Sequence, residues 1–285
     1  MLDPKKYGTP DAFRAALEQK IRSECQSKGL IVDDLKRQIS FDRFLARLDF
    51  DRYTLVGGYS LELRFAGLKR TRDIDLALTD LLIASASRQD LPDRIEADLK
   101  KYASIHLNDY FSFVIDSARS LSGPPEGGYR YHFSAMLAGR EYHKFHVDLR
   151  IQSVHILPPE MVKAPNKLDF PDVRNNRIAL ARKEEVFADK LEAYTKPRQT
   201  TNSRVRDLID MNLLLLDKLN NNTCKQAINT IFKQHKRSVP DKLEPPPELW
   251  REQFTIIAQN GKLDFTMDDA FHNIESFINK LRRIV

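Results

Sequence analysis

Cysteine is scarce in this chain of 285 residues. The two cysteines are Cys25 and Cys224, and neither lies in a CxxC motif or in a paired Cys/His spacing. This pattern excludes both a disulfide framework and a zinc site of the usual kind. We therefore expect both thiols to have no part in function.

Long apolar runs are missing as well. No stretch approaches the roughly 18–20 apolar residues of a membrane span, and the N-terminal MLDPKKYGTPDAF contains no apolar core of a signal peptide. The sequence also shows no internal repeat and no low-complexity tail. We expect a soluble, cytoplasmic protein with no membrane partner.

An excess of charge of one sign is present but small. Lysine and arginine number 46 against 40 acidic residues, which gives a net charge of +6. A basic balance favours polyanions such as nucleotides and RNA, although the preference is weak at this size. The 41% of hydrophobic residues is enough to build a core, so wholesale disorder is not expected.

The first half of the chain alternates between helical and strand patterns. Helices are predicted over 10–49, 59–68 and 90–102, and strands over 53–56, 73–78, 111–115, 129–137 and 144–152. The last two strands form a hairpin that turns at Gly139-Arg140. This order predicts a mixed α/β lobe over residues 1–157, with mostly sequential strands.

The second half is nearly all helical by its periodicity. Residues 156–177 contain four prolines and little periodicity, so we expect them to connect two lobes. Helices follow at about 182–196, 203–219, 223–237, 247–260 and 267–283. The predicted fold class is α+β, with a helical C-terminal lobe over 178–285.

The strongest chemical signal is the pair Asp73 and Asp75 on one predicted strand. Because a strand alternates its faces, both carboxylates point the same way while Ile74 and Leu76 point into the core. Adjacent carboxylates repel each other unless a cation lies between them. Mg²⁺ typically binds one or two carboxylates plus substrate phosphates, so we expect Mg²⁺ or Mn²⁺ here.

A glycine pair precedes this strand. Gly57-Gly58 ends the strand 53–56 and begins a helix, where backbone N–H groups can approach the phosphates of a nucleotide. Taken alone, the aspartate pair would be an ordinary surface strand and the glycine pair only a turn. The strand–glycine–helix unit directly before the aspartates favours a functional site.

A third carboxylate is expected on a neighbouring strand. Asp148 lies between Val147 and Leu149, which face inward, so Asp148 faces the opposite side. It could complete a two-metal site and help to activate an attacking hydroxyl. The alternative is a solvated strand aspartate, and Asp116 is a weaker candidate for the same role.

The helical half carries a third cluster of charged residues. Lys190 lies beside the apolar face of its helix, where it could reach a triphosphate. Asp207 and Asp210 are three residues apart, so they share a helix face. The alternative for this cluster is a structural one, in which Arg206 and Asp207 form an ordinary surface ion pair of little value.

Four segments together resemble the AbiEii/AbiGii-type nucleotidyltransferases, the toxin components of type IV toxin–antitoxin and abortive-infection systems. The segments are GGYSLELRF, RTRDIDL, VFADKLEAY and RVRDLIDM. Their order and spacing match the family from about residue 40 to 220, and the mycobacterial MenT toxins are relatives. The last 65 residues contain no motif that we can match to the family.

The resemblance implies a DNA polymerase β-like nucleotidyltransferase fold followed by a helical lobe. It also implies roles for matching positions: nucleotide binding for Gly58 and Ser60, metal binding for Asp73 and Asp75, a catalytic lysine in Lys190, and the RDxxD motif in Asp207 and Asp210. One departure is the stretch Lys196–Ser203, which is longer than the short basic turn of the family. This stretch is a candidate for substrate contacts.

The function implied is transfer of a nucleoside monophosphate from an NTP to an acceptor. In relatives the acceptor can be the tRNA 3′ end, which blocks aminoacylation, and an antitoxin is the expected partner. Basic residues near the motifs could form a groove for RNA: Arg64, Lys69, Arg70, Arg72, Lys196, Arg198, Arg204 and Arg206.

Three alternatives remain open from the sequence. The acceptor could be a protein, or the fold could move the γ-phosphate as a kinase does. The chain could also be a non-catalytic binding module on a degenerate fold. The intact Asp73/Asp75 pair and Lys190 argue against the last of these.

Overall fold

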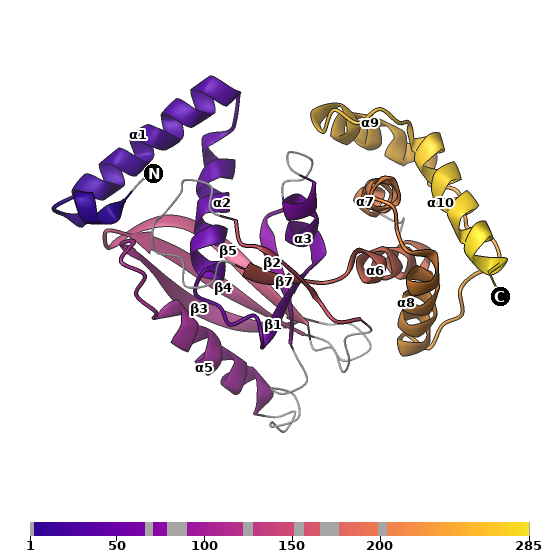
Figure 1. Cartoon of the computed structure of the whole chain (residues 1–285), viewed down its shortest axis with the longest axis horizontal. Helices are drawn as coiled ribbons and strands as arrows, with labels where there is room; N and C mark the ends of the chain where they lie inside the picture. The colour runs from indigo at the N-terminus through magenta and orange to yellow at the C-terminus, as the bar shows by residue number, and fades with distance from the viewer. Residues whose placement is uncertain are drawn as a thin grey trace. The chain divides into compact units, whose positions relative to one another are not determined.

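The computed structural model describes residues 3–65, 71–78, 90–121, 128–150, 157–165, 177–198 and 204–284. The chain divides into two units (Figure 1). The first, which we call the sheet unit, comprises Met1–Leu63, Arg70–His155 and Pro159–Leu180. The second, the helical unit, comprises Arg64–Lys69, Ile156–Pro158 and Ala181–Val285. The α+β class expected from the sequence is confirmed.

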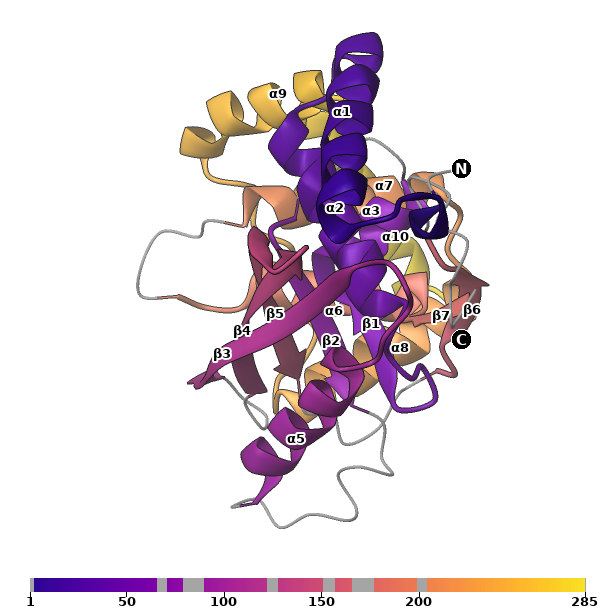
Figure 2. The same cartoon turned by 90° about the vertical axis from the view of Figure 1, so that its left-hand side faces the viewer.

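The described part of the sheet unit contains one seven-stranded sheet of order β3-β4-β5-β2-β1-β7-β6 (Figure 2). The strands are β1 (Tyr53–Val56), β2 (Asp73–Leu78), β3 (Phe111–Leu121), β4 (Gly128–Leu137), β5 (Arg140–Arg150), β6 (Glu160–Lys163) and β7 (Arg177–Leu180). The pairs β2–β5 and β1–β7 are parallel, and the other neighbours are antiparallel. The sheet is therefore mixed, as expected.

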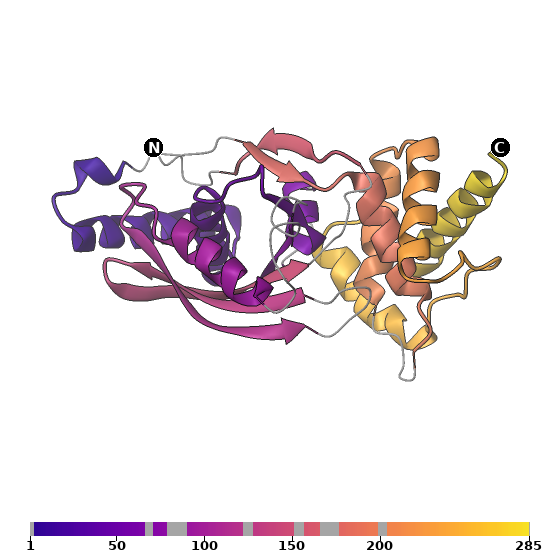
Figure 3. The ribbon, with the colours of Figure 1, turned by 90° about the horizontal axis from the view of Figure 1, so that it is seen from below.

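Helices α2 (Val32–Leu45) and α5 (Leu91–Ala103) cover the same face of this sheet (Figure 3). On β4, Phe133 packs its ring against Phe44 of α2. Two residues earlier on the same strand, the Tyr131 hydroxyl donates to the Pro92 carbonyl of α5. Since residues two apart on a strand share a face, the apolar core lies on this side. The opposite face is left for polar side chains.

The N-terminal helices form because their apolar residues recur every three or four positions. In α1 (Pro10–Lys28), Phe13, Leu17, Ile21 and Cys25 are all buried, as the periodicity predicted. Thr9 caps the start of the helix, and Gly29 ends it with a left-handed φ of 63°.

An ion cluster anchors α2 to the start of β3. Arg43 Nε lies 2.6 Å from Asp109 Oδ2, and Arg47 Nη2 lies 2.7 Å from Asp109 Oδ1. All three side chains are at most 2% exposed. Because the cluster is closed off from water, each partner is needed to compensate the others.

The stretch 156–177 differs from the connection that we expected. Glu160–Lys163 and Arg177–Leu180 are strands of the sheet, so residues 159–180 go with the sheet unit. The prolines fit this arrangement because Pro159 precedes β6, which is an edge strand, and edge strands tolerate proline at their ends. Residues 166–176 lie outside the described part.

The hairpin between β4 and β5 also starts earlier than predicted. Strand β5 begins at Arg140 and not near residue 144, because Ala138 and Gly139 alone form the turn. Both have left-handed φ values, 53° and 71°, which suit a two-residue hairpin turn.

The helical unit contains the helices expected in the second half. They are α6 (Lys183–Thr195), α7 (Val205–Leu216), α8 (Asn221–Gln234), α9 (Arg251–Asn260) and α10 (Met267–Arg282). Phe187 and Leu191 of α6 and Leu208 of α7 are fully buried. Within the described residues, no helix has the length and apolarity needed to cross a membrane.

Candidate active site

Asp73 and Asp75 lie on the polar face of β2, in the middle of the sheet. Ile74 and Leu76 are fully buried on the other face, as the alternation predicted. The side chain of Asp73 is 31% exposed and that of Asp75 only 17%. Asp75 is therefore the more enclosed of the two carboxylates.

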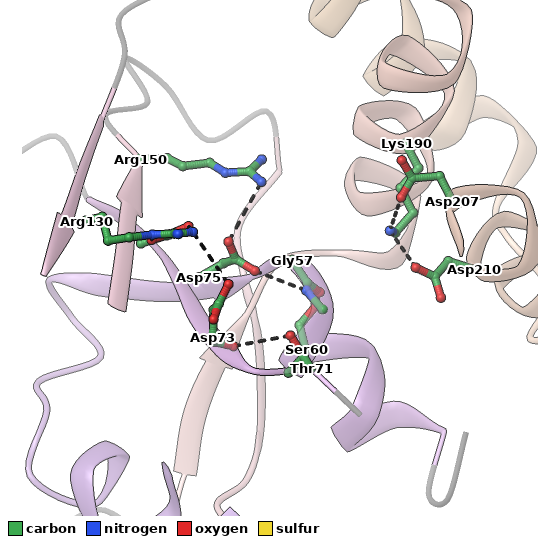
Figure 4. Close-up of polar contacts among 12 residues, drawn as sticks. Gly57, Ser60, Thr71, Asp73, Asp75, Arg130, Arg150, Lys190, Asp207 and Asp210 are labelled. Carbon is green, nitrogen blue, oxygen red and sulfur yellow. Dashed lines mark hydrogen bonds and ion pairs between the residues drawn. The ribbon is translucent and has the colours of Figure 1, made fainter. Parts of the chain in front are cut away.

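The enclosure of Asp75 comes from the glycine turn at the end of β1 (Figure 4). Gly57 adopts a φ of +62°, and a Cβ atom there would lie 2.0 Å from Asp75 Oδ2. The next residue, Gly58, donates its N–H to the same Oδ2 at 3.3 Å. Only glycine fits at position 57, because both the backbone conformation and the space forbid a side chain.

Ser60 is part of the same turn. Its side chain is fully buried, and its hydroxyl donates to the Gly57 carbonyl at 2.7 Å. The contact stabilises the first turn of α3 (Gly57–Arg64), which presents the backbone of Gly58 to Asp75. The role in nucleotide binding expected for Ser60 stays a prediction.

The surroundings of Asp75 disfavour its charged form. Burial raises the pKa of this carboxyl most strongly, Arg150 opposes the shift, and the neighbouring Asp148 and Asp73 raise it further. Arg150 Nη2 lies 3.9 Å from Asp75 Oδ1. A cation that approached this carboxylate would relieve the repulsion among the three aspartates.

The structure places Asp148 beside Asp75. The two are direct partners in the parallel pair β2–β5, although they are far apart in sequence. Asp148 is held by Arg130 of β4, with Nε–Oδ1 and Nη2–Oδ2 distances of 2.6 Å each. Arg130 Nη2 also lies 3.5 Å from Asp73 Oδ2. No pattern in the sequence marks Arg130 as a residue of the site.

Two histidines on the same face were also missed. His146 is the β5 partner of Asp73, and its Nδ1 lies 3.5 Å from Asp73 Oδ1. The ring of His132 on β4 contacts the His146 ring edge-on, with centroids 4.4 Å apart. Asp116, the weaker candidate, accepts a hydrogen bond from Ser134. It lies on β3, beyond both β4 and β5 as seen from β2.

Glu62 holds the segment that leads into β2. Its buried carboxylate accepts hydrogen bonds from Arg37 and Gln38 of α2. It also accepts the backbone N–H of Thr71 at 3.2 Å. This network fixes the chain two residues before Asp73, so it positions the aspartate pair. A glutamate inside a helix gives no sequence signal of such a role.

The donor set suits a divalent cation bound in the manner of Mg²⁺. Asp73 and Asp75 offer hard carboxylate oxygens on one face, and Mg²⁺ usually binds one or two carboxylates while phosphate and water oxygens complete its shell. Asp148 lies next to this pair, but both of its oxygens already accept N–H groups of Arg130. Among the described residues no cluster of three or more His, Cys, Asp or Glu has metal-binding geometry.

A second charged cluster lies within the helical unit. Lys190 Nζ donates to Asp207 Oδ1 at 2.9 Å and to Asp210 Oδ2 at 2.6 Å (Figure 4). The two aspartates therefore share a helix face, as their spacing predicted. Burial lowers the pKa of Lys190, but Asp210 and Asp207 outweigh it and the net shift is upward. Arg204 Nη1 lies 3.3 Å from Asp207 Oδ2, so Asp207 forms an ion pair with Arg204, where the structural alternative had named Arg206.

The same unit contains a cavity of about 640 Å³ at the C-terminal end of α6. Its lining includes Tyr194, Lys196, Arg198, Arg237, Lys242 and Pro245. Two of the basic residues expected to contact RNA, Lys196 and Arg198, therefore line the same cavity. Lys69 and Arg70, also expected to contact RNA, lie outside the described residues.

Comparison with known proteins finds a family match over most of the chain. Residues 41–275 match the family model described as nucleotidyl transferase AbiEii toxin of type IV toxin–antitoxin systems. This range extends beyond residue 220, where the motifs that we could match end. A search of curated protein sequences gives no match.

Among solved structures, the chain is similar to MenT4, a nucleotidyltransferase toxin from Mycobacterium tuberculosis H37Rv. The TM-score is 0.57 at 14% identity, over 93% of this chain and 98% of that one. It also matches JHP933 from Helicobacter pylori, with a TM-score of 0.40 and 14% identity over 88% and 92% of the chains. The match to MenT4 shows a common fold.

Proposed function

The chain belongs to the AbiEii family of nucleotidyltransferase toxins of type IV toxin–antitoxin systems, and we propose that it transfers a nucleoside monophosphate from an NTP to the 3′ end of tRNA. The observation that carries the proposal is the enclosed Asp75, beside Asp73 and covered by the glycine turn. A pair of carboxylates beside a glycine turn at the start of a helix suits a metal-bound triphosphate.

In the proposed reaction, the acceptor hydroxyl oxygen forms a bond to the α-phosphorus. The bond between the α-phosphorus and its bridging oxygen breaks, and pyrophosphate leaves. The hydroxyl proton passes to a carboxylate, for which the candidates are Asp148, Asp207 and Asp210. Transfer of this kind depends on positioning and on neutralised charge more than on covalent chemistry.

Residues of both units have roles in this proposal. Asp73 and Asp75 would hold Mg²⁺ or Mn²⁺, which when bound neutralises charge on the triphosphate. The turn at Gly57, Gly58 and Ser60 would bind the phosphates through its backbone. Lys190, a cation fixed by two aspartates, would neutralise phosphate charge as well. We propose that each of these groups is needed for transfer.

The proposal of an RNA acceptor is supported by the basic cavity in the helical unit. Lys196 and Lys242 contribute to its lining, and neither ammonium group has an ion-pair partner among the described residues. Cations without ion-pair partners are available to phosphate groups. Modified tRNA could no longer be aminoacylated, so translation would stop unless an antitoxin opposed the enzyme.

The test is a labelling experiment on the purified full chain. The protein is incubated with each α-labelled NTP, Mg²⁺, total tRNA and a protein extract. We expect label on tRNA, and none on tRNA that lacks its 3′-terminal nucleotides. Asp75→Asn should abolish the label, whereas Asp116→Asn should not, because Asp116 lies on the same sheet face but three strands away on β3.

Other outcomes would assign a different acceptor or reaction. Label found only on protein would replace the RNA acceptor with a protein acceptor. Label transferred from γ-labelled but not from α-labelled NTP would show a phosphotransferase. Undiminished labelling by Asp75→Asn would contradict the assignment of the site itself.

A further inference from the structure

Arg130 binds Asp148 and reaches toward Asp73 on the polar face of the sheet. Figure 4 shows its guanidinium pointing to Asp73. Its Nε and Nη2 bind the two oxygens of Asp148 in parallel, the bidentate geometry that makes a charge-assisted pair strong. The same Nη2 lies 3.5 Å from Asp73. The hydrogen bonds that Arg130 donates to Asp148 raise the pKa of Arg130 further above its usual value, so the guanidinium stays charged.

Two arginines face three aspartates on this part of the sheet. Arg130 pairs with Asp148 and approaches Asp73, while Arg150 approaches Asp75. The side chains of these five residues thus carry one unit of net negative charge. One divalent ion reverses that charge, and a second would have to displace Arg130 from Asp148. Because both oxygens of Asp148 are bound by Arg130, the geometry favours a single ion.

The guanidinium keeps hydrogen-bonding capacity after binding Asp148. Arginine has five N–H donors in a planar fork, and Asp148 takes two of them. The two donors on Nη1 have no partner among the described residues. The Arg130 side chain is 34% exposed, so these donors can be reached by an anion. A planar fork of this kind matches the oxygens of a phosphate group.

We propose that Arg130 binds the triphosphate of the NTP and serves as the second cation of the site, in place of a second metal ion. In this arrangement Asp148 is a positioning residue, which holds the guanidinium and does not bind metal. The inference rests on the proposed function, because it requires the NTP to bind at the Asp73/Asp75 pair. It is independent of which acceptor is used.

The alternative is an ordinary ion pair on the sheet surface. Exposed pairs contribute little to stability, and their loss leaves ligand binding unchanged. Arg140, on the same hairpin, forms such an exposed pair with Asp11. Its Nη2 lies 2.9 Å from Asp11 Oδ1, and both side chains are 67% exposed. Arg140→Ala is therefore the matched control for a variant of Arg130.

The experiment measures binding and not turnover. A non-hydrolysable NTP with a methylene bridge between its α- and β-phosphorus atoms is titrated into the full chain, and Mn²⁺ bound per chain is counted by paramagnetic resonance in the presence of that analogue. Arg130→Ala should weaken analogue binding by roughly 10- to 100-fold, the loss of a charged hydrogen-bonded contact. Arg130→Lys should recover part of it, and Arg140→Ala should change nothing.

Metal counting separates the two roles of Asp148. We expect one Mn²⁺ per chain in the unmodified protein and in Asp148→Asn, together with weaker binding of the analogue in Asp148→Asn. Two Mn²⁺ per chain, with one lost in Asp148→Asn, would make Asp148 a metal ligand and overturn the proposal. Unchanged analogue affinity in Arg130→Ala would equally overturn it.

The outcome can be told apart from a failure of the proposed function. If tRNA receives no label but Arg130→Ala weakens analogue binding, the acceptor is wrong and this inference stands. If the unmodified protein binds neither analogue nor Mn²⁺, both fail. A melting temperature within the range of the Arg140→Ala control shows that the Arg130→Ala and Asp148→Asn proteins are folded.

Discussion

Replacing Gly57 with alanine would test how the glycine turn controls the active site. A left-handed conformation costs a residue with a Cβ about 1–2 kcal/mol relative to glycine. The new Cβ would also lie 2.0 Å from Asp75 Oδ2, so the carboxylate must move and lose the Gly58 N–H. A hydrogen bond to a charged group contributes about 1.5–3 kcal/mol. We expect Gly57→Ala to lower the free energy of unfolding by roughly 3–5 kcal/mol.

Gly29 offers a matched control within the same unit. Its φ of +63° equals that of Gly57 within a degree, but a Cβ there would have nothing within 4 Å. Gly29→Ala should therefore cost only the conformational part, about 1–2 kcal/mol, and leave transfer intact. Urea denaturation gives both free energies, and the α-label assay gives the activities. Equal destabilisation by the two variants, with activity kept in Gly57→Ala, would refute the steric link to Asp75.

The remaining predictions concern charges. Lys190→Ala should abolish transfer and cost about 3–5 kcal/mol in urea denaturation, because it removes the cation that two largely buried aspartates share. Lys190→Arg should restore only part of both losses. Near-normal turnover of Lys190→Ala would contradict this prediction. Burial alone would raise the pKa of Asp109, but its two arginine partners outweigh burial and lower it. The stabilisation by Asp109 is therefore present above the unfolded-state pKa and is lost as pH falls through the lower folded-state pKa. The difference in free energy of unfolding between wild type and Asp109→Asn should shrink from pH 7 to pH 3. A constant difference would argue against this role of Asp109. The affinity for tRNA should fall steeply with salt: the slope of log K against log salt concentration should be about −0.7 per single-stranded phosphate contact. The double variant Lys196→Ala/Lys242→Ala should make this slope less steep. An unchanged slope would exclude the cavity as an RNA contact.

The parts of the site that sequence reasoning identified are local ones. Strand alternation alone fixes that Asp73 and Asp75 share a face, and both core residues between and after them are buried as predicted. The turn at Gly57 and Gly58 could also be predicted, because a tight turn between a strand and a helix favours residues without side chains. The sequence also predicted that Asp207 and Asp210 share a face, since that depends only on helical spacing.

Arg130 could not be predicted because its partner depends on a bulge. If the β4–β5 pairing ran without a break from the turn at residues 138 and 139, Arg130 would be opposite Val147 and not opposite Asp148. The register shifts between Ala135 and Met136, and this brings Arg130 opposite Asp148. No composition signal marks the bulge, so the strongest ion pair of the site was missed.

The strands β6 and β7 were missed for a different reason. Each has only four residues, and the stretch that contains them is rich in proline, which argues for a loop. Strand β7 forms nonetheless because it lies between β1 and β6 and buries Ile178, Ala179 and Leu180. Such a strand is stabilised by neighbours that come from distant parts of the sequence, and a local pattern cannot report them.

The three aspartates of the sheet show what local pattern and long-range pairing each contribute. Asp73 and Asp75 are made neighbours by one strand, but Asp148 reaches Asp75 only through the parallel pairing of β2 with β5. A slip of one residue in that pairing would place Val147 or Leu149 beside Asp75 and turn Asp148 to the apolar core. The buried side chains of Val147 and Leu149 oppose such a slip, because both would be moved to the polar face, away from Ile74 and Leu76. The apolar face of the sheet therefore sets the register that assembles the charged face, and variants of Val147 that weaken the core should reduce nucleotide binding without touching a charged residue.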